Sequence, residues 1–343
     1  MKAMVLKKII DLASNRSPLE LVDVPVPIPN EREIQVKVFV CGVCHTELDE
    51  IEGRTMPTKF PIIPGHQIVG CVERLGNGSA KFKIGDRVGI AWIHSACGKC
   101  KFCRNGMENL CNAFKATGRD ADGGYAEYTV VPETFAYRIP EVFTDAEAAP
   151  LLCAGAIGYR SLRLSNMKNG EKIGLTGFGA SAHLVLKMVR HLYPESKTYV
   201  FSRTAGERAF AREMGAAWAG STEEESPEKL HAIIDTTPAW KPVADAMRNL
   251  EKGGRLVINA IRKEDRDKDA LVGLDYTRDL WMEKEIKSVA NITRNDVEDF
   301  LKLAEDIAIK PEIREYSLED ANTALLELKD RKIRGAKVLR IAS

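Results

Sequence analysis

Short runs of alternating apolar and polar residues fill the first third of the chain, a pattern typical of β-strands with one buried face. Residues 34–38 alternate with a period of two, and residues 5–6, 19–26, 68–72 and 87–92 form further apolar runs. Pro25, Pro27 and Pro29 keep the connection between two of these runs extended, because proline cannot continue a helix. This part of the chain is therefore predicted to be largely β.

From about residue 154 the pattern changes to apolar runs that alternate with helical periodicity. Strands are predicted at 172–176, 199–201, 232–235, 255–258 and 287–292, and a helix near 243–250. A further helix is predicted after residue 180, because Val185, Met188, Val189 and Leu192 recur at the spacing of one helix face. Such alternation predicts a doubly wound parallel sheet. A helix-like pattern begins at residues 145–152, and the charged segment 263–269 is expected to be a solvated loop. Helical patterns at 296–307 and 318–329 and a strand at 336–341 close the chain.

A glycine-rich turn joins the first of these strands to its helix. Gly177, Gly179 and Ala182 form a G-x-G-x-x-A pattern within a βαβ unit, which is the context that a dinucleotide-binding fingerprint requires. The first glycine permits the turn, the second lets the backbone approach a pyrophosphate, and the helix N-terminus stabilises the anion. The pattern predicts a Rossmann domain that binds a dinucleotide.

The end of the second strand of that unit predicts which dinucleotide is bound. NAD binding favours an Asp or Glu there, which accepts hydrogen bonds from the ribose hydroxyls. This chain has Ser202 and Arg203 instead. A hydroxyl and a guanidinium suit a 2′-phosphate, so NADP(H) is favoured over NAD(H); a solvated surface arginine is the alternative reading of Arg203.

Length and composition exclude several classes of function. The 343 residues suffice for about two domains, and 50 Lys plus Arg against 49 Asp plus Glu leave no charge excess to attract nucleic acid or anionic membrane. No apolar run reaches the ~20 residues of a membrane span, and the lysine-containing N-terminus is unlike a signal peptide. A cytoplasmic protein is expected. Clustered cysteines then indicate metal sites rather than disulfides.

One cluster places four of the eight cysteines within fifteen residues, with the spacing C-x2-C-x2-C-x7-C. It consists of Cys97, Cys100, Cys103 and Cys111. Short spacings of this kind suit a closed tetrahedral zinc site with no position left for water, so the site is predicted to be structural. An iron–sulfur cluster is the alternative, but the fourth spacing and the absence of a following Cys-Pro favour zinc.

A second candidate metal-binding stretch lies at residues 41–47. It holds two thiols, an imidazole, a hydroxyl and a carboxylate, in the order Cys41, Cys44, His45, Thr46 and Glu47, on what we expect to be a tight turn. Soft ligands beside a hydroxyl favour a zinc ion with an open coordination position, for which the rest of the chain must supply further ligands. His66 follows at a predicted loop-to-strand junction.

Together these motifs resemble the zinc-containing alcohol dehydrogenases of the medium-chain dehydrogenase/reductase superfamily over nearly the whole chain. The resemblance rests on CGVCHT at 41–46, PGH at 64–66, the four-cysteine lobe at 97–111, PLLCAG at 150–155 and the fingerprint at 177–182. It implies an α/β protein with a largely β, GroES-like catalytic domain at 1–153 and 294–343 and a Rossmann domain at 154–293.

The resemblance also implies roles for individual residues. Cys44, His66 and Cys153 would ligate a catalytic zinc, with a fourth position for water or a substrate oxygen. Glu47 would orient His66, and Thr46 would touch the substrate oxygen and begin the proton relay. His45 and Arg334 would contact the pyrophosphate of the cofactor, and Trp92 would line the substrate pocket.

This chain departs from the family pattern at three positions near the implied zinc. Glu47 replaces an Asp that is frequent in the family, Asp49 stands where several members have a relay histidine, and Gln67 replaces a Glu beside the ligand histidine. The loss of that last carboxylate would leave the zinc environment less negative. We hypothesise that this favours alkoxide binding.

The expected activity is reversible hydride transfer between an alcohol and NAD(P), with one catalytic and one structural zinc per chain. A polyol or other secondary-alcohol dehydrogenase is the alternative within the superfamily, and a zinc-free quinone reductase is disfavoured. A zinc-ribbon protein that binds nucleic acid is the alternative from another class, disfavoured because the positive and negative charges of the chain balance. The expected partners are small alcohols or aldehydes and further copies of the chain, as a homodimer or homotetramer.

Overall fold

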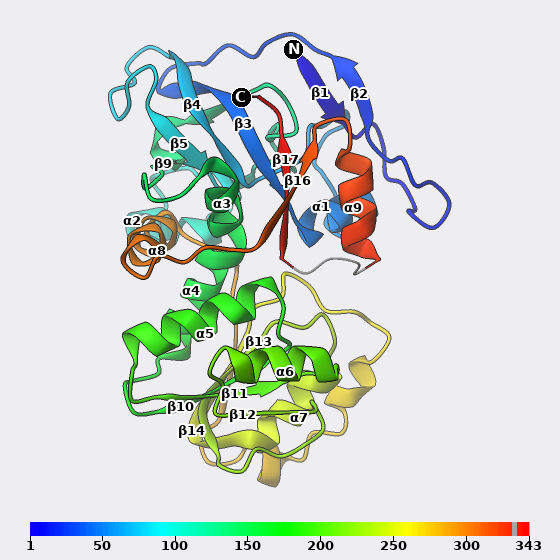
Figure 1. Cartoon of the computed structure of the whole chain (residues 1–343), viewed down its shortest axis with the longest axis vertical. Coiled ribbons are helices and arrows are strands. Elements are labelled where there is room, and N and C mark those ends of the chain that lie inside the picture. The colour runs from blue at the N-terminus through cyan, green and yellow to red at the C-terminus, as the bar shows by residue number, and fades with distance from the viewer. Residues whose placement is uncertain (331–334, 343) are drawn as a thin grey trace. The chain divides into compact units, whose positions relative to one another are not determined.

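The computed structural model describes residues 1–330 and 335–342, which fold into two compact units (Figure 1). The first unit comprises Met1–Cys153 and Thr293–Ser343, and the second comprises Ala154–Ile292. Arg334, one of the residues expected to bind the cofactor, lies outside the described residues. In the described part of the chain, no helix is long and apolar enough to cross a membrane.

The first unit is built on a seven-stranded sheet with the order β16-β17-β3-β4-β5-β9, in which β8 also pairs with β3. Its strands are β3 (Glu33–Val43), β4 (Ile68–Leu75), β5 (Arg87–Ile90), β8 (Tyr128–Pro132), β9 (Ala136–Arg138), β16 (Ile313–Ser317) and β17 (Ala336–Arg340). All its pairings are antiparallel except that of β16 with β17. Two small antiparallel sheets complete the β structure, namely β1 (Lys2–Val5) with β2 (Glu20–Asp23) and β6 (Ile93–Ser95) with β7 (Lys115–Ala116).

Strand β3 lies inside this sheet and is largely buried, because its Ile and Val side chains suit a pleated, packed surface. The helices of the first unit are α1 (His45–Ile51), α2 (Lys101–Arg104), α3 (Asp145–Pro150), α8 (Arg294–Asp306) and α9 (Ala321–Lys329). Capping boxes begin α3 at Thr144 and Glu147 and α8 at Thr293 and Asp296, which satisfies backbone N–H groups that a helix start leaves free.

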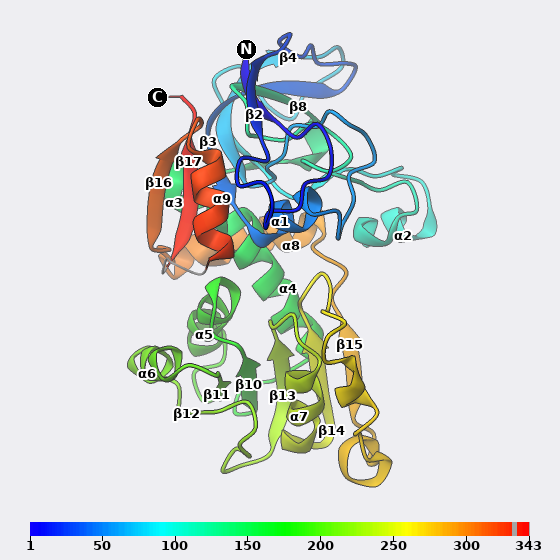
Figure 2. The same ribbon diagram turned by 90° about the vertical axis from the view of Figure 1, so that its right-hand side faces the viewer.

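The second unit contains a six-stranded sheet with the order β12-β11-β10-β13-β14-β15, in which all pairings are parallel (Figure 2). The strands are β10 (Lys172–Thr176), β11 (Lys197–Phe201), β12 (Trp218–Gly220), β13 (Leu230–Asp235), β14 (Leu250–Ile258) and β15 (Glu285–Ser288). Helices α4 (Ala156–Ser165), α5 (Ala180–Leu192), α6 (Ala205–Glu213) and α7 (Lys241–Asn249) complete the unit. This strand order is that of the Rossmann fold, and it confirms the predicted doubly wound parallel sheet.

Two local expectations need correction. The stretch 41–47 is not a tight turn, because Cys41–Val43 end β3 and His45 begins α1 directly after Cys44. The helical pattern near 145–152 does not continue as one α-helix either. Pro150 closes α3, and the chain passes through a π-helical segment, Leu151–Gly155, before α4 begins. This wider turn carries Cys153.

Candidate functional site

Three side chains from separate parts of the first unit meet in one cluster. Cys44 is the residue before α1, His66 precedes β4, and Cys153 lies in the π-helical segment after α3. Their ligand atoms all lie within 4.8 Å of one another. The Sγ atoms of Cys44 and Cys153 are 3.8 Å apart, and Nε2 of His66 is 3.3 Å from Sγ of Cys153.

These separations fit a tetrahedral zinc ion. Zn–S bonds of about 2.3 Å and Zn–N bonds of about 2.0–2.1 Å place two sulfurs roughly 3.8 Å apart and a sulfur and a nitrogen roughly 3.6 Å apart. Three protein ligands leave a fourth position, as catalytic zinc sites require. The cluster therefore has the donor atoms and spacing of an open zinc site.

A buried carboxylate orients the histidine of this cluster. Oε1 of Glu47 lies 2.6 Å from Nδ1 of His66, and both side chains are almost fully buried. The other oxygen of Glu47 accepts a hydrogen bond from the backbone N–H of Cys44 at 2.7 Å. A proton held on Nδ1 leaves Nε2 free to ligate a metal. Glu47 therefore holds two of the three ligands in position.

The charges in the cluster favour a cation at its centre. A hydrogen bond from the Cys153 thiol holds the pKa of Cys44 well below its usual range. Burial alone would lower the pKa of His66, but the Glu47 carboxylate and the Cys44 thiolate hold it well above its usual range. In the protein without metal, the lowered pKa of Cys44 and the raised pKa of His66 both favour a thiolate beside a proton on the imidazole. A divalent cation would replace that proton.

The four cysteines of the lobe form the second cluster, again with all ligand atoms within 4.8 Å of one another. Sγ of Cys103 lies 3.9 Å from that of Cys97 and 3.6 Å from that of Cys100, close to the roughly 3.8 Å expected around one zinc ion. Backbone N–H groups of Lys99 and Cys100 lower the pKa of Cys97 to about 6. Four sulfurs around one centre leave no open position, which favours a structural site.

Residues beside the first cluster lie as follows. The hydroxyl of Thr46 is 3.6 Å from Sγ of Cys44, whereas His45 is exposed. Cys41 is buried and Cys71 half-buried, and neither belongs to a metal cluster among the described residues. Trp92 is buried against Phe114, with ring centroids 4.9 Å apart.

The glycine-rich turn of the second unit has the geometry that a pyrophosphate site needs. Gly177 follows β10 with φ of +79°, a conformation that favours glycine, and a side chain there would meet Thr236 and Thr237. Gly179 immediately precedes α5, and a Cβ there would meet nothing within 4 Å. Ala182 is fully buried in α5. The backbone at Gly179 is therefore open to a ligand at the start of a helix.

The end of β11 contains more charged groups than the sequence reading considered. Ser202 is buried and its hydroxyl donates a hydrogen bond to the carboxylate of Glu207, while Arg203 is exposed. The guanidinium of Arg208 donates to the backbone oxygens of Ser202 at 2.8 Å and Arg203 at 3.0 Å. Arg208 was missed because it is seven residues beyond the end of β11, and only the first turn of α6 brings it back.

A buried ion pair in the second unit was also missed. Residues 263–269 were read as a solvated loop, but the side chains of Lys263 and Asp235 are 6% and 0% exposed and form an ion pair. The ammonium group of Lys263 also donates to the backbone oxygens of Thr237 and Ala239. This pair fixes the segment after β13 beside Gly177. No local pattern in the sequence signals it, because its partners are 28 residues apart.

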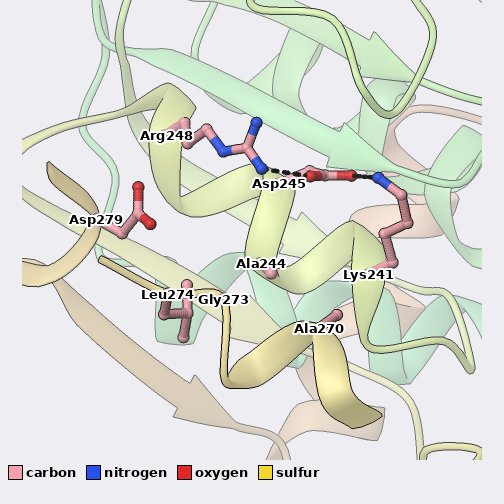
Figure 3. Close-up of a pocket in the computed structure, with 8 residues that line it drawn as sticks. All are labelled: Lys241, Ala244, Asp245, Arg248, Ala270, Gly273, Leu274 and Asp279. Carbon is pink, nitrogen blue, oxygen red and sulfur yellow. Dashed lines mark hydrogen bonds and ion pairs between the residues drawn. The ribbon is translucent and has the colours of Figure 1, made fainter. Parts of the chain in front are cut away.

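The second unit also contains a cavity of about 320 Å³ beside α7 (Figure 3). Lys241 and Arg248 both donate to Asp245 across its wall, at 2.8 and 2.9 Å, and Asp279 pairs with Arg278. The residues that line the cavity carry two positive charges, on Lys241 and Arg248, and two negative charges, on Asp245 and Asp279, so the cavity offers no excess charge to a charged ligand.

Comparison with known proteins assigns the family. Residues 30–141 match the model for the alcohol dehydrogenase GroES-like domain. The probable alcohol dehydrogenase AdhA of Mycobacterium tuberculosis is 42% identical over 329 residues, which cover 94% of this chain and 93% of that protein. The chain belongs to the zinc-containing alcohol dehydrogenases of the medium-chain dehydrogenase/reductase superfamily. An alcohol dehydrogenase of Geobacillus stearothermophilus is 32% identical over 333 residues, covering 94% of this chain and 96% of the relative.

Solved structures of the family share this fold and offer a metal-bound example. A cobalt- and zinc-bound thermostable alcohol dehydrogenase from Pyrobaculum aerophilum has a TM-score of 0.84 at 25% identity and covers 99% of both chains. This alcohol dehydrogenase thus has a GroES-like β domain and a Rossmann domain, two zinc sites and a nicotinamide cofactor. The family assignment leaves the nucleic-acid-binding alternative without support.

Proposed function

We propose that this alcohol dehydrogenase uses NADP(H) in preference to NAD(H) to interconvert alcohols with aldehydes or ketones. The observation that supports the preference is the end of β11, where the guanidinium of Arg208 lies on the backbone of Ser202 and Arg203, Arg203 is exposed, and residues 202–203 contain no carboxylate. A 2′-phosphate carries up to two negative charges and pairs well with guanidinium groups. The carboxylate of Glu207, which accepts from Ser202, opposes a phosphate there, whereas the guanidinium groups of Arg203 and Arg208 favour it.

The residues of the first cluster would perform the chemistry. When bound, zinc supplies a Lewis acid that makes an alcohol hydroxyl more acidic, and the nicotinamide accepts hydride. Cys44, His66 and Cys153 would hold the metal, and Glu47 would keep Nε2 of His66 directed at it. The Thr46 hydroxyl would take part in moving the alcohol proton, as its position 3.6 Å from Sγ of Cys44 allows.

The remaining proposed roles concern the two organic ligands. Gly177, Gly179 and Ala182 would accommodate the pyrophosphate at the start of α5, with His45 and Arg334 as further contacts. Trp92 would line the substrate pocket. A polyol or other secondary alcohol remains the alternative substrate class.

A homodimer or homotetramer is proposed as the working form. Strand β15 ends the parallel sheet, all four of its residues are exposed, and Ile286 is 43% exposed. An uncovered edge strand has free backbone groups that pair readily with a second copy. Sedimentation velocity of the purified enzyme measures the assembly directly.

The cofactor preference is tested by steady-state kinetics with NADPH and NADH on one aldehyde. We expect a higher kcat/KM with NADPH, and a fall of about 10- to 100-fold in Arg203→Ala, as loss of a charge-assisted pair implies. The kcat/KM of Arg203→Ala with NADH should stay within about two-fold of the wild-type value. Arg266→Ala is the matched control, since this arginine of the second unit is 67% exposed. A wild-type enzyme that prefers NADH would refute the proposal.

A further inference from the structure

Glu50 is a buried carboxyl group with no hydrogen-bonding partner. Its side chain is 2% exposed, and neither Oε1 nor Oε2 has a hydrogen-bond donor. The other acids of α1 are engaged, Glu47 with His66 and Asp49 with Arg54, both at 2.6 Å. Buried polar groups in folded proteins are almost always paired, because leaving them unpaired is unfavourable. The free capacity of Glu50 therefore requires an explanation.

The position of Glu50 on α1 places it beside the reacting centre. Residues four apart on a helix share a face, with Cβ atoms about 5–6 Å apart, so Glu50 lies one turn beyond Thr46 on the same face. Thr46 in turn lies 3.6 Å from Sγ of Cys44. The charges of Glu47, His66 and Cys44 all act on Glu50, as expected for a group near the zinc cluster.

Two more unpartnered polar groups lie in the same region. The indole Nε1 of Trp92 and the hydroxyl of Tyr125 are buried without a hydrogen-bond partner. Arg119 connects Trp92 to Glu50, because its guanidinium lies 5.4 Å from the Trp92 ring centroid and its charge acts on Glu50, while the charge of Glu50 acts on Tyr125. Arg119 itself pairs with Asp120 at 2.7 Å. The wall around the zinc cluster thus contains unused donors and acceptors, which a polar ligand would satisfy.

The protonation state of Glu50 indicates which ligand group fits. Burial and the neighbouring Glu47 carboxylate raise the pKa of Glu50 well above its usual range, against the opposing influence of His66 and Arg119. A carboxyl group accepts hydrogen bonds in either protonation state, and a hydroxyl group can both donate to it and accept from it. A neutral hydroxyl is therefore a better match than a second anion.

We propose that Glu50 is a specificity-determining residue that binds a second hydroxyl of the substrate, so that diols and hydroxyaldehydes are favoured over plain alcohols of the same length. This inference rests on the proposed function, because it assumes that the reacting oxygen is held beside Thr46. The Cβ atoms of Thr46 and Glu50 are expected to be about 5–6 Å apart, as for any two residues four apart on a helix. A substrate in which roughly three or four carbons separate the reacting oxygen from the second hydroxyl spans a distance of that order.

The test compares kcat/KM for butane-1,4-diol and butan-1-ol in the wild-type enzyme and in Glu50→Leu and Glu50→Gln. We expect the diol to be the better wild-type substrate, and the diol-to-alcohol ratio to fall at least ten-fold in Glu50→Leu. Glu50→Gln keeps hydrogen-bonding atoms and should retain most of the ratio. Glu298→Leu, at a half-exposed glutamate of the same unit, should leave the ratio unchanged.

A second readout separates substrate recognition from a structural role. Replacing an unpaired buried carboxyl by leucine should raise the Tm of the enzyme, whereas loss of a structural contact would lower it. An unchanged ratio in Glu50→Leu, or a lowered Tm in both variants, would overturn the inference. Both substrates are measured with NADP and with NAD, so a wrong cofactor proposal changes the absolute rates in one series and leaves the ratio informative.

Discussion

Oε1 of Glu47 lies 2.6 Å from Nδ1 of His66, while its other oxygen accepts the backbone N–H of Cys44. One buried carboxylate therefore holds a histidine and a cysteine that are 22 positions apart in the chain. The pair also decides which ring nitrogen of His66 is available, because a proton shared with Glu47 at Nδ1 leaves Nε2 to face the sulfurs.

Glu47→Gln should weaken zinc binding at the Cys44, His66 and Cys153 cluster by about 10- to 100-fold, the usual effect of removing such a partner. The glutamine side chain has nearly the volume of the glutamate and keeps one oxygen that can accept from the backbone N–H of Cys44, so α1 should remain folded. Zinc content after dialysis against a graded series of chelators measures the change. The four-cysteine cluster serves as the internal control and should keep its metal; equal loss from both clusters would indicate general unfolding instead.

Removal of a ligand from the lobe should affect stability rather than specificity. Cys103→Ser should release one of two zinc equivalents per chain and lower the unfolding free energy by more than about 3 kcal/mol, because the three remaining sulfurs then lack the metal that joins them. Thermal unfolding and metal analysis report both effects. The diol-to-alcohol rate ratio below the new Tm should match the wild-type ratio, and a changed ratio would argue that the lobe shapes the substrate site.

Lys263→Met should destabilise the enzyme by about 3–5 kcal/mol, because it leaves Asp235 buried without its cation. Combining it with Asp235→Asn should recover much of that loss, since the asparagine oxygen can still accept from Thr237. Urea denaturation of the single and double variants measures this coupling. The matched control is Lys268→Met, at a lysine 62% exposed, which should change stability by less than about 0.5 kcal/mol. If the destabilising effects of Lys263→Met and Asp235→Asn simply add in the double variant, the ion-pair interpretation is wrong.

Much of the metal and cofactor binding could be predicted, because the residues that carry it are of characteristic types and lie close together in the chain. The four cysteines of the lobe lie within fifteen residues, and Gly177, Gly179 and Ala182 lie within six, so local geometry alone brings each group together. The strand order of the second unit likewise follows from regular alternation of strands and helices, since parallel strands need helical crossovers. These features depend on neighbours in the chain.

Features that depend on distant contacts were missed or misread. The stretch 41–47 was read as a tight turn, although its Cys44 and Glu47 form the start of a helix. Lys263 was placed in solvent because the charged residues around it suggest an exposed loop, and only packing against Asp235 buries it. No prediction was made for Glu50, because its burial without a partner is a property of the folded unit.

The sequence by itself determined the family, the two sets of metal-binding residues and the dinucleotide fingerprint, because residue identity and spacing carry that information. Only the tertiary structure decided that Glu47 bonds His66, that Arg208 returns to the end of β11 and that Glu50 is enclosed beside Thr46. Each of these depends on which side chains are removed from water together. That is decided by the packing of elements far apart in the chain, to which no local pattern corresponds.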